Sequence, residues 1–214
     1  MKNILIPLAI LVAIWVAWRL RSRRALLPCP AEFDWLVEIE NPLARATRSP
    51  QVVQQLAPPA GARVIDIGCG PGRVTIPLAR AVGSTGEVIA LDVQAGMLAK
   101  VAEKAKKEGI GNIRLMQSDV RRAQIHAGSL DAAVMVMALG EIPEGNTIFP
   151  LIFAALKPGG CLLVAESIFD PHFVSRPKLR RIAQAAGFTE RTYSGNVFGY
   201  SLRFEKPEVS RRFG

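Results

Sequence analysis

The 214-residue sequence has few of the residues that build disulfide frameworks and metal sites. Its three cysteines, Cys29, Cys69 and Cys161, are far apart and form no C-x-x-C pair, which argues against a disulfide scaffold and a thiolate zinc site. Its two histidines, His126 and His172, show no H-E-x-x-H or H-x₃₋₅-H spacing, so we expect no metal. Charged residues make up 21% of the chain and hydrophobic residues 50%, which excludes intrinsic disorder.

Acidic residues are missing from the first 24 positions, and the charge is therefore unevenly spread. The formal net charge is +9, of which +5 comes from Lys2 and four arginines among residues 1–24. The remaining 190 residues carry only +4. A protein that reads nucleic acid would spread its positive charge over the folded domain, so we expect no nucleic-acid partner.

An unbroken apolar run extends from Ile4 to Trp18 and is followed by the arginine cluster of residues 19–24. We interpret residues 1–24 as a single-pass membrane anchor with a basic flank, and Trp15 and Trp18 as its interfacial residues. A cleaved signal peptide would have its basic residues before the apolar run, and the positive-inside rule places the following domain in the cytoplasm. A lipoprotein signal ending at Cys29 and a buried core helix are the weaker alternatives.

Residues 25–60 contain six prolines and are interpreted as a linker with two short helices, over about 32–40 and 50–56. Ser49 is the expected N-cap of the second helix and Pro50 its first residue. The plain interpretation is that these helices pack against the main domain. The alternative is a lid over a substrate pocket, with Phe33 and Trp35 in contact with an apolar substrate.

Residues 61–214 alternate short apolar strands with helices. The expected strands are 62–67, 87–92, 113–118, 130–137, 161–167, 189–194 and 197–205, and the expected helices are 74–82, 96–108, 147–156 and 178–186. This alternation predicts a Rossmann-like α/β fold with a seven-stranded, mostly parallel sheet and helices on both faces. A short turn at 194–196 makes the last two strands an antiparallel hairpin. The expected architecture is this domain plus one N-terminal transmembrane helix.

A glycine-rich turn, Asp66-x-Gly68-x-Gly70-x-Gly72, joins the first strand to the first helix of this domain. Glycines there let the backbone approach a ligand at the carboxyl end of the sheet. Arg73 stands where the dinucleotide fingerprint requires its third glycine, and a carboxylate at Asp66 would repel a pyrophosphate but attract an ammonium group. A nicotinamide oxidoreductase is therefore the disfavoured alternative.

From about Pro50 to Lys206 the chain resembles the class I S-adenosylmethionine-dependent methyltransferases. The resemblance implies that the glycine-rich turn holds the methionine part of the cofactor, S-adenosylmethionine. It implies that Asp92, at the end of the second strand, accepts hydrogen bonds from both ribose hydroxyls, and that Asp119 accepts one from the adenine amine. Lys157-Pro158-Gly159-Gly160 before the fifth strand is a further mark of the family.

The same resemblance implies further cofactor contacts. Val93 and Met97 would flank the adenine, the Val120 N–H would reach a ring nitrogen, and Met137 would lie beside the cofactor. Simpler interpretations exist, since the glycines can serve strand–helix packing and Asp92 and Asp119 can be helix N-caps. Two aspartates at the ends of successive strands, facing one crevice, favour ligand binding.

The segment after the fourth strand, residues 137–143, would border the methyl acceptor. It is apolar and lacks the (Asn/Asp)-Pro-Pro-(Tyr/Phe) motif of enzymes that methylate planar amides and base amines. In this it resembles small-molecule and lipid methyltransferases, including the ubiquinone/menaquinone and phosphatidylethanolamine types. Glu141 is the candidate catalytic base, or else only a helix N-terminal acid. His126 and His172 are expected at the surface, with His172 nearer the substrate, and the basic residues of 176–181 form a solvated face or contact anionic lipid.

We therefore expect an enzyme that transfers a methyl group from S-adenosylmethionine to a lipophilic or membrane-associated small molecule or lipid. One alternative is a membrane-tethered enzyme that methylates a protein or a soluble small molecule. The other is a non-catalytic cofactor-binding scaffold. The oligomeric state and the methyl-accepting atom are not predicted.

Overall fold

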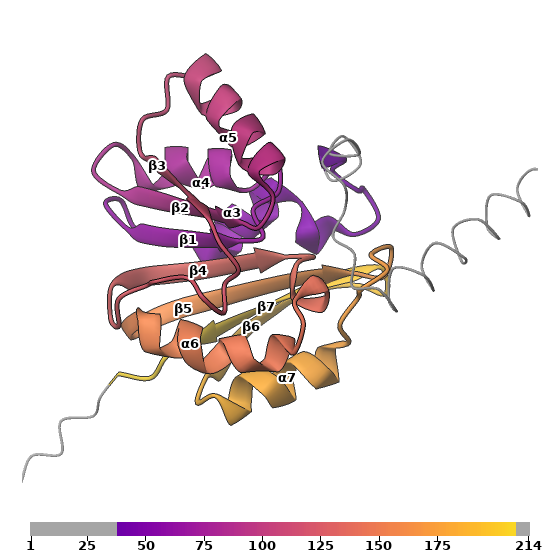
Figure 1. Cartoon of the computed structure of the whole chain (residues 1–214). Coiled ribbons are helices and arrows are strands. Elements are labelled where there is room, and N and C mark those ends of the chain that lie inside the picture. The colour runs from indigo at the N-terminus through magenta and orange to yellow at the C-terminus, as the bar shows by residue number, and fades with distance from the viewer. Residues whose placement is uncertain (1–37, 209–214) are drawn as a thin grey trace, which may run out of the picture.

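The apolar runs of the sequence pair into one seven-stranded mixed sheet (Figure 1). The computed structural model describes residues 38–208. The strands are β1 (Arg63–Ile67), β2 (Glu87–Asp92), β3 (Ile113–Gln117), β4 (Leu130–Val136), β5 (Leu156–Ser167), β6 (Thr189–Gly195) and β7 (Gly199–Glu205). Their order across the sheet is β3-β2-β1-β4-β5-β7-β6, and β7 runs antiparallel to both of its neighbours. The other pairs are parallel, so the antiparallel hairpin lies at one edge.

Helices cover both faces of this sheet. They are α3 (Ser49–Leu56), α4 (Thr75–Val82), α5 (Ala95–Lys107), α6 (Ile148–Ala155) and α7 (Arg176–Ala185), with 3₁₀ turns η2 (Arg45–Thr47), η3 (Leu139–Glu141) and η4 (Gly145–Thr147). Leu162 and Val164 of β5 pack in one apolar core with α6 and α7, whereas Leu163 and Ala165 pack in a second core with α3 and α4. Because both faces of β5 are covered, its sequence is continuously apolar rather than alternating.

The switch point of the sheet lies between β1 and β4. The helix after β1, α4, packs on one face, and the helix that follows β4, α6, packs on the other. Such an arrangement opens a crevice at the carboxyl ends of the two strands, and this is where ligands of open α/β sheets bind. In Figure 1, β4 and β5 point toward the side of the molecule where the indigo segment near residue 38 lies. A ligand site is therefore expected at the carboxyl ends of β1, β2, β4 and β5.

Two local predictions differ from the structure. β5 begins at Leu156, so residues 157–160, predicted to end a helix, continue a strand in which Leu156 pairs with Leu130 of β4. Ser49 is the first residue of α3 rather than its N-cap, and its backbone N–H and hydroxyl both contact the Glu40 carboxylate. In both cases a contact distant in sequence overrode a local signal.

The prediction that the architecture includes one transmembrane helix has to be corrected. Residues 1–24, on which that prediction fell, lie outside the described residues, as does most of the predicted helix at 32–40 with Phe33 and Trp35. Within residues 38–208, no helix has both the length and the apolar composition to cross a bilayer. The fold is thus a Rossmann-like α/β domain with a mixed sheet, and the transmembrane helix is not part of it.

Candidate functional site

The glycine-rich turn after β1 is held between the ends of two other strands. Gly68, Gly70 and Gly72 all have positive φ, at 69°, 53° and 88°. The Gly68 N–H donates to the Leu91 carbonyl of β2 at 2.8 Å, and a Cβ at Gly68 would lie 2.5 Å from the Ala138 Cβ after β4. A side chain would not fit there, so the turn brings bare backbone to the crevice.

The Asp92 carboxylate, at the end of β2, fastens this turn. Its Oδ2 accepts a hydrogen bond from the Gly70 N–H at 2.9 Å, and its Oδ1 accepts one from the Gln94 N–H at 2.9 Å. The N-cap of α5 is Gln94, so Asp92 is not a helix cap. The side chain is only 7% exposed. A carboxylate has about four lone-pair sites, so Asp92 retains acceptor capacity for a vicinal diol, as its predicted role requires.

Asp119 follows β3, and its carboxylate is hydrogen-bonded to Arg121. Its carboxylate oxygens accept from the Arg121 Nε, at 3.0 Å each, and from the Arg121 backbone N–H at 2.9 Å. These hydrogen bonds lower the pKa of Asp119 to about 2, so the group is ionised at neutral pH. The next regular element after Asp119 is the strand β4, so no helix begins directly after Asp119 and the N-cap interpretation does not apply. An adenine amine would have to share this carboxylate with Arg121.

Val93 and Met97, predicted to flank the adenine, and Val120, predicted to reach a ring nitrogen through its N–H, have different environments. Val93 is 52% exposed and lies directly after Asp92, where a ring could pack on it. Val120 is buried in the core shared with α6 and α7, so only its backbone is a candidate for a ring contact. Met97, in α5, is buried. The structure thus presents Val93 at the crevice most directly.

Asp66 lies beneath the turn rather than in it. It is 2% exposed in β1, and its Oδ2 accepts a hydrogen bond from the Thr75 hydroxyl at 2.7 Å. Burial raises the pKa of Asp66 to about 6, against the opposing effects of the Thr75 hydrogen bond and the positive charge of Arg73. Burial also raises the pKa of the neighbouring Cys69 thiol, which keeps it protonated and gives it no nucleophilic character.

The segments that follow β4 and β5, which were predicted to border the methyl acceptor, lie against each other. Met137 has a φ of +55°, and its N–H donates to the Ala165 carbonyl of β5 at 2.8 Å. Glu141 ends the short η3 turn. A Cβ at Gly140 would overlap the His172 backbone, so η3 and the β5–α7 loop are in direct contact. Of the two histidines, His172 is buried in this loop and His126 is exposed elsewhere.

A buried carboxyl on β5 was not predicted. Glu166 is almost fully buried, and its Oε2 accepts a hydrogen bond from the Val174 N–H at 3.1 Å. Burial first, and then the charges of Asp170 and Glu141, raise the pKa of Glu166 well above its usual range. The sequence signal was a glutamate inside the apolar run 161–167.

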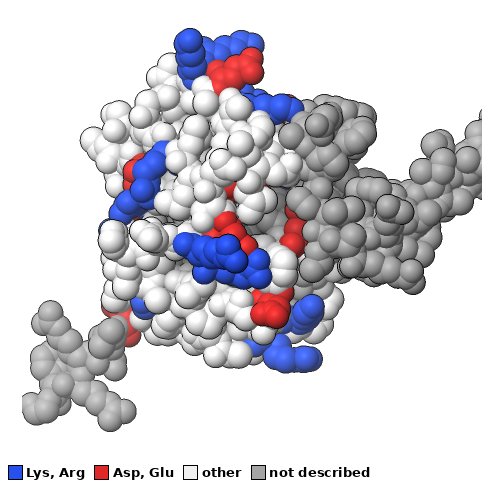
Figure 2. All heavy atoms as spheres, viewed as in Figure 1, with Lys and Arg blue, Asp and Glu red and all other residues white. Residues whose placement is uncertain are grey.

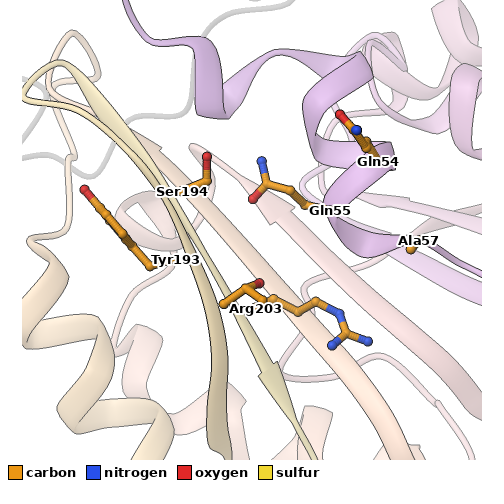
Figure 3. Close-up of a pocket in the computed structure, with 7 residues that line it drawn as sticks. Gln54, Gln55, Ala57, Tyr193, Ser194 and Arg203 are labelled. Atoms are coloured by element: carbon orange, nitrogen blue, oxygen red, sulfur yellow. The ribbon is translucent and has the colours of Figure 1, made fainter.

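The open cavity with the best-defined lining lies away from the residues predicted to bind the cofactor. A cavity of about 390 Å³ lies between α3 and the β6–β7 hairpin, lined by Gln54, Gln55, Arg203 and neighbours (Figure 3). None of the residues predicted to bind the cofactor lines it. On the face drawn in Figure 2, basic and acidic side chains lie beside one another, as surface ion pairs require.

Known proteins resemble this chain in fold and in the sequence that carries the predicted site. A family model described as "Methyltransferase domain" matches residues 64–160, which include the glycine-rich turn, Asp92 and Asp119. A structure of an S-adenosylmethionine-dependent methyltransferase from Aquifex aeolicus superposes with a TM-score of 0.73 at 19% identity, over 84% of this chain and 100% of that one. Residues 64–160 thus match a methyltransferase domain, and the fold is that of an S-adenosylmethionine-dependent methyltransferase, in agreement with the predicted enzyme class and cofactor.

Relatives identified by sequence include methyltransferases whose names specify a quinone. The chain is 32% identical to a demethylmenaquinone methyltransferase of Lactococcus lactis over 146 residues, covering 67% of this chain and 55% of that protein. It is 32% identical over 126 residues to the ubiquinone/menaquinone biosynthesis C-methyltransferase UbiE of Erwinia tasmaniensis, covering 58% and 47%. The chain therefore spans about half the length of these relatives.

Proposed function

We propose that this chain transfers the methyl group of S-adenosylmethionine to a lipophilic small molecule with a quinone-type ring. The observation that carries the proposal is the glycine-rich turn fastened by Asp92 and faced by the apolar segment that begins at Met137. Support for the acceptor comes from the relatives, whose names specify menaquinone and ubiquinone biosynthesis.

The bound cofactor would supply a methyl group already activated by its sulfonium. The chain would have to hold it, align an acceptor and exclude water. The Asp92 carboxylate and the backbone of the glycine-rich turn would hold the sugar and the methionine part. On the acceptor side the walls would be η3 and the β5–α7 loop, which contact each other at Gly140 and His172.

Methylation of a ring carbon forms a C–C bond, breaks the S–CH₃ bond and releases one ring proton. A hydroquinone is electron-rich and can serve as the nucleophile, so we propose the reduced ring as the reacting form. Glu141 is the candidate to accept the proton, because it ends η3 beside the acceptor side. Its part in catalysis remains a proposal.

A non-catalytic cofactor-binding protein is the other function to test. The same fold occurs in SpnF, a [4+2]-cyclase, which superposes with a TM-score of 0.68 at 19% identity. The fold alone therefore does not establish methyl transfer. The formation of S-adenosylhomocysteine separates the two functions.

The experiment supplies the chain with radiolabelled S-adenosylmethionine and reduced demethylmenaquinone. A membrane lipid extract and a soluble protein fraction are tested in parallel. We expect label in the quinone and an equal amount of S-adenosylhomocysteine. Label only in soluble protein would contradict the lipophilic acceptor, and cofactor binding without product would favour the non-catalytic function.

A further inference from the structure

Residues 38–49, which we call the strap, cross the carboxyl edge of the sheet. At one end, the Lys104 ammonium of α5 contacts the Glu38 carboxylate and donates to the Pro71 carbonyl of the glycine-rich turn at 2.9 Å. At the other end, the Asn196 side-chain amide in the β6–β7 turn donates to the Leu43 carbonyl at 2.8 Å. The strap therefore joins the glycine-rich turn, predicted to hold the cofactor, to the β6–β7 hairpin.

One ion pair fixes the middle of the strap to the cofactor turn. Arg73 directly follows Gly72, and its Nη1 lies 3.2 Å from Glu40 Oε2 and donates to the Thr47 carbonyl at 2.9 Å. The Arg73 side chain is only 9% exposed. Glu40 also accepts from the Ser49 N–H at 3.0 Å, so it joins the turn to the start of α3.

Because Arg73 is buried, separating it from Glu40 would be energetically costly. A guanidinium stays charged in proteins, and a buried charge without its partner is strongly destabilising. Two carboxylates balance Arg73, since Glu40 pairs with it directly and the charge of Asp66 attracts it from below the turn. If Glu40 moves away, the Arg73 charge has to follow it or find water, and either change displaces the strap or the turn.

We propose that Arg73 and Glu40 are positioning residues of the cofactor site, whose ion pair holds the strap against the glycine-rich turn and sets the space for the methionine end of the cofactor. This inference rests on the proposed function only for the identity of the cofactor. Neither residue needs to touch the cofactor. Their effect passes through the backbone of the turn that follows β1.

The test compares three variants of the full chain, Glu40→Gln, Arg73→Gln and their combination. The matched control is Glu87→Gln, which removes partly exposed ion pairs with Arg63 (2.6 Å) and Arg114 (3.4 Å) at the opposite edge of the sheet. S-adenosylmethionine affinity is measured by calorimetry. Folding is checked by circular dichroism, and hydrogen exchange is followed in residues 43–57.

We expect each single variant to weaken cofactor binding about tenfold, and the combination to be no weaker than the worse single variant, because the two side chains act as one unit. Faster hydrogen exchange in the strap should accompany each loss. The control should stay within about twofold of the wild type.

Folded variants with unchanged affinity, or with strictly additive losses, would overturn the inference. Wild-type protein that binds no cofactor would overturn both this inference and the proposed function. Cofactor binding without methyl transfer would overturn the proposed function alone. The two ideas therefore fail in distinguishable ways.

Discussion

Glu166 and Tyr200 face each other across the β5–β7 ladder and both bind Val174. The Val174 N–H donates to Glu166 Oε2 at 3.1 Å, and the Tyr200 hydroxyl donates to the Val174 carbonyl at 2.6 Å. One antiparallel pair of side chains thus fixes the end of the β5–α7 loop, the proposed wall of the acceptor side. The loop owes its position to β7, the strand that reverses the direction of the sheet.

Removing the Tyr200 hydroxyl should loosen this loop. Tyr200→Phe leaves the buried Val174 carbonyl without its donor, at an expected cost of about 1–3 kcal/mol in the free energy of unfolding. Urea denaturation measures the loss. The control is Tyr193→Phe on the exposed part of β6, expected within about 0.5 kcal/mol of the wild type. Equal unfolding midpoints for Tyr200→Phe and the wild type would contradict this account.

The protonation of Glu166 should make stability depend on pH. Because burial raises the pKa of Glu166 in the folded state, its contribution to stability is fully present below the unfolded pKa near 4.5 and is lost as pH rises through the folded value. Glu166→Gln keeps an acceptor for the Val174 N–H but does not ionise. The variant should therefore gain stability relative to the wild type as pH rises from about 4.5. If the free energies of unfolding of Glu166→Gln and the wild type differ by the same amount at every pH from 4 to 9, Glu166 does not titrate in this way.

Ionisation of Asp66 should likewise lower the stability of the folded protein as pH rises, over a narrower pH range. Its pKa rises from 3.8 to about 6 in the folded state, so the wild type should lose up to roughly 3 kcal/mol between these pH values. Asp66→Asn still accepts from the Thr75 hydroxyl and should lack this loss. Thr75→Val removes a hydrogen bond that lowers the pKa and should extend the loss to higher pH. A pH-independent difference between Asp66→Asn and the wild type would exclude the buried titration.

Because Gly68 and Ala138 approach closely, a mutation at Gly68 should be only partly compensated by a second mutation at Ala138. Gly68→Ala adds a methyl group 2.5 Å from the Ala138 Cβ and forces a non-glycine residue to a φ of +69°, so we expect a loss of about 2 kcal/mol or more. Adding Ala138→Gly removes the clash but not the backbone strain, and should restore only part of the stability. Full restoration in urea denaturation would mean that φ strain is absent.

Asp92 should be the strongest single determinant of cofactor affinity. Asp92→Ala removes the predicted ribose contact and the acceptor that fastens Gly70, so we expect S-adenosylmethionine to bind more than about tenfold more weakly. Calorimetry measures the change, with Glu87→Gln as the control from the same strand. Unchanged affinity in a folded Asp92→Ala protein would refute the assignment of the cofactor crevice.

The regular parts of the fold could be predicted because their signals are local. β2 has its predicted bounds, Glu87–Asp92, since an apolar run ending in an aspartate is complete within six residues. The extension of β5 back to Leu156 could not be predicted, because it depends on pairing with Leu130, which is distant in the chain. The glycine-rich turn was also a local signal, since its three glycines lie within five residues directly after β1, and the structure gives Gly68, Gly70 and Gly72 positive φ.

The candidate site was predictable only in outline. Asp92 was placed correctly at the end of a strand, yet its hydrogen bond to the Gly70 N–H spans 22 residues and has no sequence signal. The Arg73–Glu40 pair spans 33 residues and was missed, although Arg73 had been noted as the residue that breaks the dinucleotide fingerprint. Asp66 was expected to meet an ammonium group, and the structure places it against Thr75, so its contact with the cofactor stays a prediction.

The Asn196–Leu43 hydrogen bond joins residues 153 positions apart, and this has a consequence for biosynthesis. Chains are made from the amino end, so residues 38–49 leave the ribosome long before the hairpin that receives them. During that interval Leu43 has no partner from β6 or β7, and the crevice remains open on that side. A nascent chain stalled before residue 196 should therefore be cut by protease near Leu43, whereas the finished chain should resist.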